Sequence, residues 1–342
     1  MTAPLDPSQI IQIGMGFFAS KVLLSAVELQ LFTKLAQEPA TRQDIATTLQ
    51  LNGRGAADFL DTLVSLGLIE RQGSGDTAVY SNSAQTARFL DRASPHYIGG
   101  ILEMANSRLY HSWGNLTEAL RSGKPQNEVK GAQGKELFDA LYADPRRLEV
   151  FIAAMAGIQQ GNFAALAETF DFSKYRSMCD VGGASAALAM AVARRHPQVT
   201  CMSFDLPPVT QVARRAVAAQ GLSDRVVLKS GSFFEDPLPR ADVITMGNIL
   251  HDWGLDTKRM LIRKAYEALP QGGCLIAIEN VIDDDRRKNT FGLLMSLNML
   301  IETTEGFDYT HAQFHSWCLE AGFRATELKP LTGPTSAAIA HK

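Results

Sequence analysis

The chain has 342 residues, of which 46% are hydrophobic and 20% are charged, and its 33 basic and 36 acidic side chains leave a formal net charge of −3. These values exclude disordered and fibrous proteins. Because a single core rarely exceeds roughly 250–300 residues, a chain of this length is expected to form about two domains. The near-neutral balance lacks the strongly basic domain that nucleic-acid-binding proteins usually carry, so we expect no nucleic-acid partner.

The sequence also predicts a cytoplasmic protein without a membrane partner. The longest stretch without a charge, Val150 to Ala167, has polar residues at its centre and is not a span of ~20 apolar residues. Charged side chains near the N-terminus interrupt any apolar region of a signal peptide. The four cysteines are far apart, which indicates buried, reduced thiols rather than disulfides or a zinc site.

The N-terminal region is expected to be a helical domain. Apolar residues from Ile10 to Leu31 lie on too many sides of one helix for a single flat core, so a partner subunit is expected to cover it. Packing within its own chain is the alternative. Helices at Thr41 to Leu49 and Arg54 to Leu66, followed by a hairpin of strands Leu68 to Arg71 and Ala78 to Tyr80, form a winged-helix pattern.

A winged helix can read DNA with its second helix. That helix has Arg54 against Asp58 and Asp61, whereas phosphate binding requires several basic side chains. We therefore predict that residues 1–100 form an all-α winged-helix dimerisation domain. A winged-helix regulator with a ligand-sensing domain is the alternative from another functional class.

The rest of the chain predicts an α/β domain. Helices are expected from about Ser94 to Ala167, and residues 101–160 are assigned to a helical linker that contributes to a substrate pocket. Strands then alternate with helices, which is typical of a doubly wound parallel sheet in a domain of residues 161–342. The predicted strands of this sheet are Met178 to Val181, Val199 to Phe204, Val226 to Leu228, Ala241 to Met246 and Cys274 to Val281, with an edge hairpin of Arg324 to Leu328 and Ala337 to Ala340.

Residues at three strand ends favour a nucleoside site. Gly182 and Gly183 let the backbone approach a ligand, although a tight turn also selects glycine. Asp205, about 20 residues further on, suits ribose hydroxyls, with a helix cap as the alternative. The G-x-G-x-x-G pattern of dinucleotide enzymes is missing, which favours adenosine without pyrophosphate. Ser232 and Phe233 offer adenine a polar group and a ring, although a phenylalanine pair is as often core.

His251 follows the fourth predicted strand and is the candidate general base. Histidine can take a proton near neutral pH. Glu279 ends the fifth strand and Asp308 follows the next helix, and either carboxylate would orient the imidazole and stabilise its cation. A helix cap or an exposed side chain is the alternative for His251, and a helix N-cap is the alternative for the neighbouring Asp252.

The motifs V-G-G, F-D-L-P-x-V, G-S-F-F, N-I-L-H-D-W, G-G-x-L-x-x-x-E and A-G-F occur in this order. As a set they resemble the S-adenosylmethionine-dependent O-methyltransferases that act on small aromatic hydroxyls. Plant caffeate-type, animal acetylserotonin-type and bacterial secondary-metabolite enzymes belong to this family. The resemblance spans nearly the whole chain. It implies a Rossmann-like catalytic domain, S-adenosylmethionine as cofactor with S-adenosylhomocysteine as product, no metal, and a homodimer formed through the N-terminal domain.

The resemblance also assigns roles to residues. His251 would be the general base, with Glu279 and Asp308 as its flanking acids. Seven residues would line the cofactor site: Gly182 and Gly183 at the methionine part, Asp205 and Leu206 at the ribose and adenine edge, Ser232 and Phe233 at the adenine, and Gly247 at the floor. This sequence departs from the family pattern at four positions, with Ala184 and Ala186 in place of glycines, Ser232 in place of an aspartate, and Asp308 in place of a glutamate. These departures bear on the affinity for the cofactor.

A histidine base favours a hydroxylated ring as acceptor. A phenol with a pKa of ~10 is ionised to only about one part in a thousand at pH 7, whereas a carboxylate needs no base. The alternatives are methylation of a nitrogen or carbon atom, or a cofactor-dependent reaction other than methyl transfer. Residues predicted to line the acceptor pocket, with core packing as the alternative for each, are Met155, Gln159, Trp253, Met295, Asn298 and Met299.

Three consecutive acids, Asp283 to Asp285, raise the possibility of a magnesium site. Neighbouring side chains cannot all face one ion, so we expect a solvated turn there. The sequence therefore predicts no metal.

Overall fold

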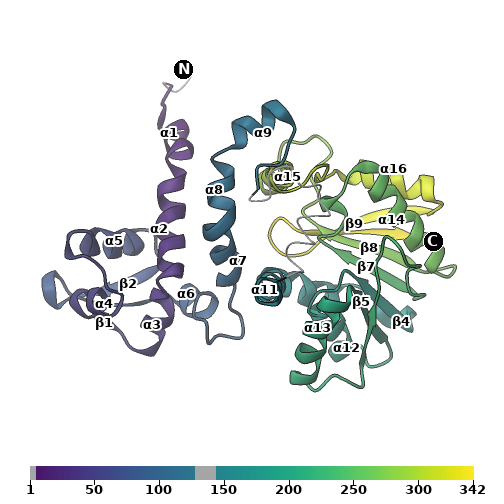
Figure 1. Cartoon of the computed structure of the whole chain (residues 1–342), viewed down its shortest axis with the longest axis horizontal. Helices are drawn as coiled ribbons and strands as arrows, with labels where there is room; N and C mark the ends of the chain where they lie inside the picture. Colours follow the sequence, from purple (N-terminus) through teal and green to yellow (C-terminus); the bar gives the residue numbers. More distant parts are fainter. Residues whose placement is uncertain (1–4, 128–143) are drawn as a thin grey trace. The chain divides into compact units, whose positions relative to one another are not determined.

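The computed structural model describes residues 5–127 and 144–342 and forms two compact units, Met1–His111 and Ser112–Lys342. Figure 1 shows the elements of both units, and each unit is described by itself. The boundaries predicted at residues 100 and 160 stay predictions.

The N-terminal unit surrounds a small sheet with helices (Figure 1). Strands β1 (Ala40–Thr41), β2 (Ile69–Gln72) and β3 (Val79–Asn82) pair in the order β1-β3-β2. The predicted hairpin is confirmed, and the domain predicted as all-α therefore contains a three-stranded sheet. The helices of this unit are α1 (Ser8–Gly14), α2 (Gly16–Glu28), α3 (Leu31–Gln37), α4 (Arg42–Thr48), α5 (Gly53–Ser65), α6 (Ala84–Phe89), α7 (Gly99–Met104) and, reaching its end, α8 (Tyr110–Trp113).

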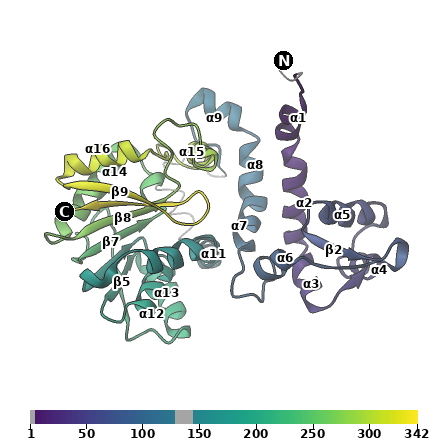
Figure 2. The same ribbon diagram turned by 180° about the vertical axis from the view of Figure 1, so that it is seen from behind.

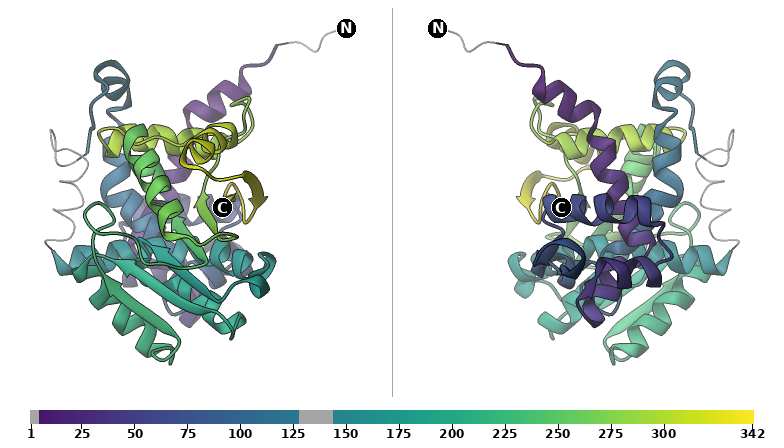
Figure 3. Two further views of the ribbon diagram at one scale, coloured as in Figure 1. Left: turned by 90° about the vertical axis from the view of Figure 1, so that its right-hand side faces the viewer. Right: turned by 90° about the vertical axis from the view of Figure 1, so that its left-hand side faces the viewer.

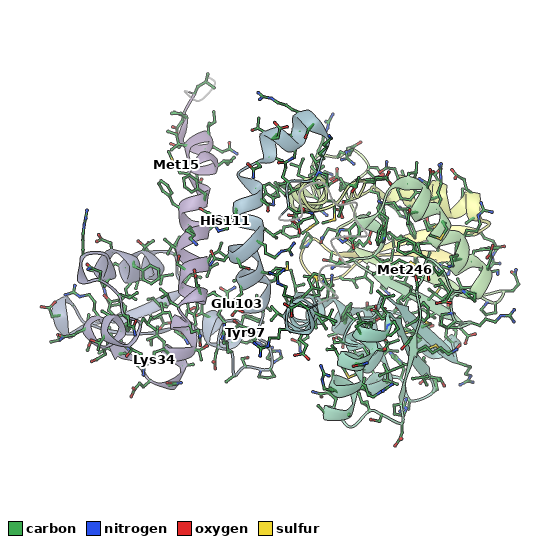
Figure 4. All side chains as sticks on the ribbon, in the orientation of Figure 1. Met15, Lys34, Tyr97, Glu103, His111 and Met246 are labelled. Carbon is green, nitrogen blue, oxygen red and sulfur yellow. The ribbon has the colours of Figure 1, made fainter. Side chains whose placement is uncertain are left out.

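Local interactions explain where these helices begin. Thr41 accepts a hydrogen bond from the Asp44 N–H while the Asp44 carboxylate accepts one from the Thr41 N–H, a capping box at the start of α4. Asn52 caps α5 by a single hydrogen bond, which its side chain accepts from the Arg54 N–H. Near α7, the Tyr97 hydroxyl donates to Glu103 at 2.6 Å, and Figure 4 labels both side chains.

The first two helices expose most of their apolar side chains within the N-terminal unit. They form one nearly continuous helix that is interrupted at Met15, which Figure 4 labels. Ile10 is 76% exposed, Ile13 74% and Phe18 58%. Within residues 5–127 and 144–342, two helical stretches would suffice by length and composition alone to cross a membrane, namely Ser8–Glu28 and Arg146–Thr169.

The C-terminal unit is built on a seven-stranded sheet with the order β6-β5-β4-β7-β8-β10-β9. All neighbouring strands are parallel except β10, which pairs antiparallel with β8 and β9. The predicted doubly wound sheet with an edge hairpin is therefore confirmed. Its strands are β4 (Ser177–Val181), β5 (Thr200–Asp205), β6 (Val226–Ser230), β7 (Val243–Gly247), β8 (Cys274–Glu279), β9 (Ala325–Pro330) and β10 (Ser336–His341).

Helices cover both faces of this sheet, as Figure 2 and the left view of Figure 3 show. Alternate residues of β8 point to opposite faces, so that Ile276 and Ile278 join the core with α12 and α13, and Leu275 and Ala277 join the core with α14 and α16. β8 is buried at every position, as expected of a central strand between two helix layers. The helices are α9 (Leu116–Ser122), α11 (Pro145–Thr169), α12 (Ala187–Arg195), α13 (Pro207–Ala219), α14 (Leu255–Ala268), α15 (Thr290–Glu302) and α16 (His311–Ala321).

The strand order reverses at β4. From this strand the chain runs outward through β5 and β6 on one side and through β7 and β8 on the other. In open α/β sheets ligands bind beyond the carboxyl ends of the strands that flank such a reversal. The candidate site therefore lies at the ends of β4 and β7.

Candidate functional site

The turn after β4 leaves no room for a side chain at its first two residues. Gly182 has a φ of +70°, and a Cβ there would overlap the Ile249 side chain. A Cβ at Gly183 would overlap the Ser203 hydroxyl. The predicted glycine pair therefore brings the main chain close to the ends of β5 and β7, which suits close approach of a ligand to the backbone.

Two alanines continue this turn in the left-handed conformation that normally favours glycine. Ala184 has a φ of 48°, and Ala186, the N-cap of α12, has a φ of 62°. The left-handed region costs a residue with a Cβ roughly 1–2 kcal/mol. The backbone thus follows the path of a glycine-rich turn although the sequence departs from it.

Asp205 ties the glycine turn to the end of β5. Its carboxylate accepts from the Ala184 N–H at 2.9 Å and from the Leu206 N–H at 2.7 Å. Burial raises the pKa of Asp205 to about 6, against the lowering effect of these two hydrogen bonds. Leu206, not Asp205, is the N-cap of α13, so the capping alternative is wrong. A carboxylate has about four acceptor sites, which leaves capacity for the hydroxyls of a ribose.

Ser232 and Phe233 lie in the loop after β6. The Ser232 hydroxyl accepts from the Phe234 N–H at 3.2 Å and the Glu235 N–H at 3.4 Å. Lys264 on α14 donates to the Phe233 carbonyl at 2.7 Å, which fixes the loop against that helix.

Trp253 packs on the same loop. Its ring centroid lies 4.8 Å from that of Phe234 and 6.1 Å from that of Phe233. The structure thus brings a residue predicted for the acceptor pocket next to the residues predicted for adenine. Gly247, at the end of β7, faces the ring of Phe163, and a Cβ there would lie 3.6 Å from it, an ordinary contact.

His251 lies on a 3-10 turn, Leu250–Asp252, between β7 and α14. Met246, labelled in Figure 4, is on β7 just before this turn. The imidazole is 7% exposed. Its Nδ1 lies 3.4 Å from Asp308 Oδ1, and its Nε2 lies 3.5 Å from Asp252 Oδ1. Since Gly254 is the N-cap of α14, Asp252 does not cap that helix.

Glu279 holds the main chain of this turn rather than the imidazole. Its Oε1 accepts from the N–H groups of Ile249 and His251, both at 3.1 Å. Asp308 is therefore the acid beside Nδ1, and Glu279 positions the backbone that carries the ring.

Two main-chain contacts fix the loop of Asp308. The Asp308 N–H donates to the Ser296 hydroxyl at 3.2 Å, and the Ile282 N–H donates to the Tyr309 carbonyl at 2.9 Å. Within the described chain, His251 Nδ1 and Asp308 Oδ2 are buried without a hydrogen bond. Such atoms are expected where a ligand or a small closing motion completes the site.

The acids around His251 decide its charge. Burial lowers the pKa of His251, but the charges of Asp252, Asp308 and Glu279 outweigh burial and raise it to about 10. Burial also raises the pKa of Asp252 to about 6, opposed by His251. The resting site therefore favours a protonated imidazole, which must lose its proton before it can act as a base.

Five of the six residues predicted for the acceptor pocket lie on two helices, and the sixth, Trp253, follows the turn of His251. Met295, Asn298 and Met299 are on α15, and Asn298 Oδ1 accepts from the Trp113 indole N–H at 2.9 Å. Met155 and Gln159 are on α11.

The polar groups of α11 are linked to a distant loop. Gln159 Oε1 accepts from the Asn162 side-chain amide at 2.9 Å, and Asn162 Oδ1 accepts from the Thr332 N–H at 3.1 Å. The pocket role of Gln159 and of the other five acceptor-pocket residues stays a prediction.

The sequence analysis missed two buried or hydrogen-bonded residues of this region, Trp113 and Lys258. Trp113 follows no motif, because its partner Asn298 is remote in the chain. Lys258 had a signal: it continues the apolar stripe of Leu261, Ile262 and Ala265 on α14 and is fully buried.

The acidic run after β8 is a structural turn. Asp283 accepts from the N–H groups of Arg287, Lys288 and Asn289 at 2.8–2.9 Å, and these bonds lower its pKa to about 2. Among the described residues, no group of three or more His, Cys, Asp or Glu side chains could hold a metal ion. The four cysteines are free and buried, as predicted.

Comparison with known proteins identifies the family. A family model described as the O-methyltransferase domain matches residues 113–324, and one described as the O-methyltransferase dimerisation domain matches residues 11–92. The chain is 41% identical to the tetracenomycin polyketide synthesis 8-O-methyl transferase TcmO of Streptomyces glaucescens over 98% of its length and 97% of that protein. It is 33% identical to the N,N-dimethyltransferase OxyT of Streptomyces rimosus over 96% of its length and 95% of that protein.

The fold agrees with these matches. The crystal structure of human N-acetylserotonin methyltransferase in complex with S-adenosylmethionine superposes with a TM-score of 0.90 at 31% sequence identity, covering 100% of this chain and 99% of that one. S-adenosylmethionine is the cofactor of the family, and the glycine turn and Asp205 described above fit such a ligand.

Proposed function

Since this chain belongs to the S-adenosylmethionine-dependent O-methyltransferase family, we propose that it methylates a hydroxyl of a small aromatic or heteroaromatic metabolite, with His251 as general base. The observation that carries this proposal is the buried imidazole beside Asp308 at the end of β7. A buried histidine next to an acid is suited to take a proton from an acceptor that is itself a weak acid.

The need for a base follows from the acceptor. Bound S-adenosylmethionine supplies a methyl group on a sulfonium. A phenol is ionised to about one part in a thousand at pH 7, which costs roughly 4 kcal/mol of reactivity unless its proton is removed. In our proposal His251 removes that proton, Asp308 stabilises the resulting imidazolium, and Glu279 keeps the turn in place through two main-chain N–H groups.

The cofactor would lie along the ends of β4, β5 and β6. Gly182 and Gly183 would line its methionine part, because their backbone is open to close approach. Asp205 would bind the ribose and Leu206 the adenine edge. The loop of Ser232 and Phe233, together with Gly247, would complete the adenine end and the floor. The packing of Trp253 on Phe233 and Phe234 supports a place for that indole near adenine as well.

The acceptor would be a flat ring held between α11 and α15. Met295 and Met299 offer adaptable thioether contacts, and Asn298 is held by Trp113 so that its amide nitrogen is left to meet a substrate oxygen. Met155 and Gln159 would face the ring from α11. TcmO is named for a step in polyketide synthesis, so we place aromatic polyketide phenols first among candidate acceptors, with hydroxyindoles second.

Methylation of nitrogen is the second candidate function. OxyT, a relative at 33% identity, is named an N,N-dimethyltransferase. A neutral amine is already a nucleophile and needs no general base for the attack, so the cluster of acids around His251 favours a hydroxyl acceptor.

A homodimer completes the proposal. The chain carries the O-methyltransferase dimerisation domain, and the exposed apolar side chains of α1 and α2 lie within it or directly beside it. A second copy of the chain would cover them. We place the dimer in the cytoplasm, without a nucleic-acid or membrane partner and without a metal.

A substrate screen tests the proposed function. The purified chain is incubated with methyl-labelled S-adenosylmethionine and a panel of hydroxylated naphthoates, anthraquinones, indoles and matched aryl amines, and products are located by mass spectrometry. We expect label on a ring hydroxyl. Label on nitrogen alone would favour the second candidate, and no transfer to any acceptor would overturn the proposal.

A further inference from the structure

Lys258 is a fully buried cation next to the acids of the candidate site. It lies on α14, one turn after the segment that carries His251, and its side chain is 0% exposed. A lysine is almost never fully buried unless its charge is compensated. The proposed reaction gives Lys258 no role, so the burial of its ammonium group needs a separate explanation.

Its direct contacts join the catalytic turn to the loop of Asp308. The ammonium donates a hydrogen bond to the carbonyl of Trp253, the residue after the 3-10 turn Leu250–Asp252. It also lies 3.5 Å from the ring centroid of Phe307 and 5.9 Å from that of Tyr309, on either side of Asp308. Cation–π contacts become stronger when the ammonium is desolvated, as it is here.

The charges that act on Lys258 are opposite to its own. Asp252, Glu279 and Asp308 all act on it electrostatically, and each of them also acts on His251. Three carboxylates thus surround one imidazole, and Lys258 is a second cation in the same buried cluster. Other titratable groups on elements packed against this turn are Tyr309, Glu302 and Glu305 at and beyond the end of α15, and Cys318 on α16.

We propose that Lys258 is a positioning residue that ties the turn carrying His251 to the loop carrying Asp308, through its hydrogen bond to the Trp253 carbonyl and its contact with the Phe307 ring. The inference rests on the proposed function of His251. Without these two contacts the turn and the loop are free to separate, which weakens the effect of Asp308 on the imidazole. Burial lowers the pKa of Lys258 to about 8, against the raising effect of the three carboxylates, so Lys258 loses its charge below the pH at which His251 titrates. Its proposed role toward His251 is therefore positional rather than electrostatic.

A hydrophobic residue at position 258 could preserve the fold but not the contacts of the ammonium group. A methionine fills the space of the lysine stem and relieves the cost of burying a charge, so Lys258→Met is expected to fold. It removes the hydrogen bond to the Trp253 carbonyl and the cation–π contact with the Phe307 ring.

Two readouts test the role. The first is the pH titration of the His251 ring followed by NMR in protein with carbon-labelled histidine, with the signal assigned among the seven histidines by its loss in His251→Gln. The second is the pH dependence of kcat/KM with an aromatic hydroxyl acceptor. We expect Lys258→Met to move the His251 titration and the rising limb of kcat/KM to lower pH by about one unit, because Asp308 is no longer held against the imidazole, and to lower the maximal kcat/KM about tenfold.

Two variants act as controls. Lys258→Arg keeps the charge and is expected to restore the limb toward its original position. Arg259→Met removes a cation from the exposed face of α14, where Arg259 pairs with Glu320, and is expected to leave both readouts unchanged. The proposal is overturned if Lys258→Met folds and the His251 titration stays in place, whether or not activity falls. Because that titration needs no substrate, its result is independent of failure of the proposed reaction.

Discussion

Asp308 Oδ1 lies 3.4 Å from His251 Nδ1, and the two side chains are buried together although 57 residues separate them in the chain. The pair joins the turn after β7 to the loop after α15. The Asp308 charge contributes to the raised pKa of His251, so removing it has a predictable sign.

Asp308→Asn is expected to lower the pKa of His251, because the imidazolium loses a neighbouring anion. The rising limb of kcat/KM against pH, measured with an aromatic hydroxyl, should move to lower pH by about 1–3 units. The maximal rate should fall as the ring loses its orienting acid. Asp285→Asn, on an exposed turn, is the control and should leave the limb in place. A limb that stays in place or moves to higher pH in Asp308→Asn would contradict this account.

The alanines of the glycine turn give a prediction on stability. Ala184→Gly should raise the melting temperature by about 2–4 °C, because relief of left-handed strain is worth about 1 kcal/mol. Ala186 has the same strain but is fully buried in the core. Ala186→Gly should be close to neutral, since the lost methyl burial of about 0.8 kcal/mol offsets the gain. Calorimetry showing that both variants are destabilised would refute the strain argument.

The resemblance to the family implies an aspartate at the position of Ser232. Ser232→Asp keeps an acceptor for the N–H groups of Phe234 and Glu235 and adds a second oxygen for an adenine amine. We expect S-adenosylmethionine to bind about threefold more tightly by isothermal titration calorimetry, less than a full charged hydrogen bond provides because Asp236 is a neighbouring anion. Ser232→Ala should bind no more tightly than the unchanged chain. Equal affinities in all three proteins would exclude Ser232 from the adenine site.

The exposed face of α2 gives a prediction on assembly. Phe18 is 58% exposed, and Phe18→Asp would bury a charge if a second chain covers it. Sedimentation velocity should show a dimer for the unchanged chain and a monomer for Phe18→Asp. Leu120→Asp on α9 charges a residue of similar exposure, 60%, and should remain dimeric. If Phe18→Asp still sediments as a dimer, the interface lies elsewhere.

The sheet could be predicted because its signals are local. Apolar runs such as Met178 to Val181 and Cys274 to Val281 alternate with helices at a spacing that only a doubly wound sheet explains, and all the strands predicted for it are present. The single helix predicted from Ile10 to Leu31 is interrupted at Met15 and ends at Glu28, and Leu31 begins the next helix. The prediction missed both breaks because the hydrophobic pattern continues through them.

The site was harder to predict where it depends on packing between distant segments. Glu279 and Asp308 were both expected beside the imidazole, but which carboxylate meets the ring and which meets the main chain depends on strand ends and loops that no motif describes. Trp253 was expected near the acceptor, and its contact with Phe234 follows from the loop after β6. Lys258 was overlooked because a charged residue is normally solvated, although its helical spacing matched the buried stripe.

The proton transfer by His251 is the central claim, and one measurement tests it most directly. kcat/KM is compared for His251→Gln and the unchanged chain with two acceptors of the same ring, one with an ordinary phenolic hydroxyl and one whose hydroxyl is acidified to a pKa of about 7, while cofactor affinity is checked by calorimetry. We predict a loss of about 10²- to 10⁴-fold with the ordinary phenol, a much smaller loss with the acidified one, and unchanged cofactor binding. Equal losses with both acceptors, or near-full activity with the ordinary phenol, would contradict the account.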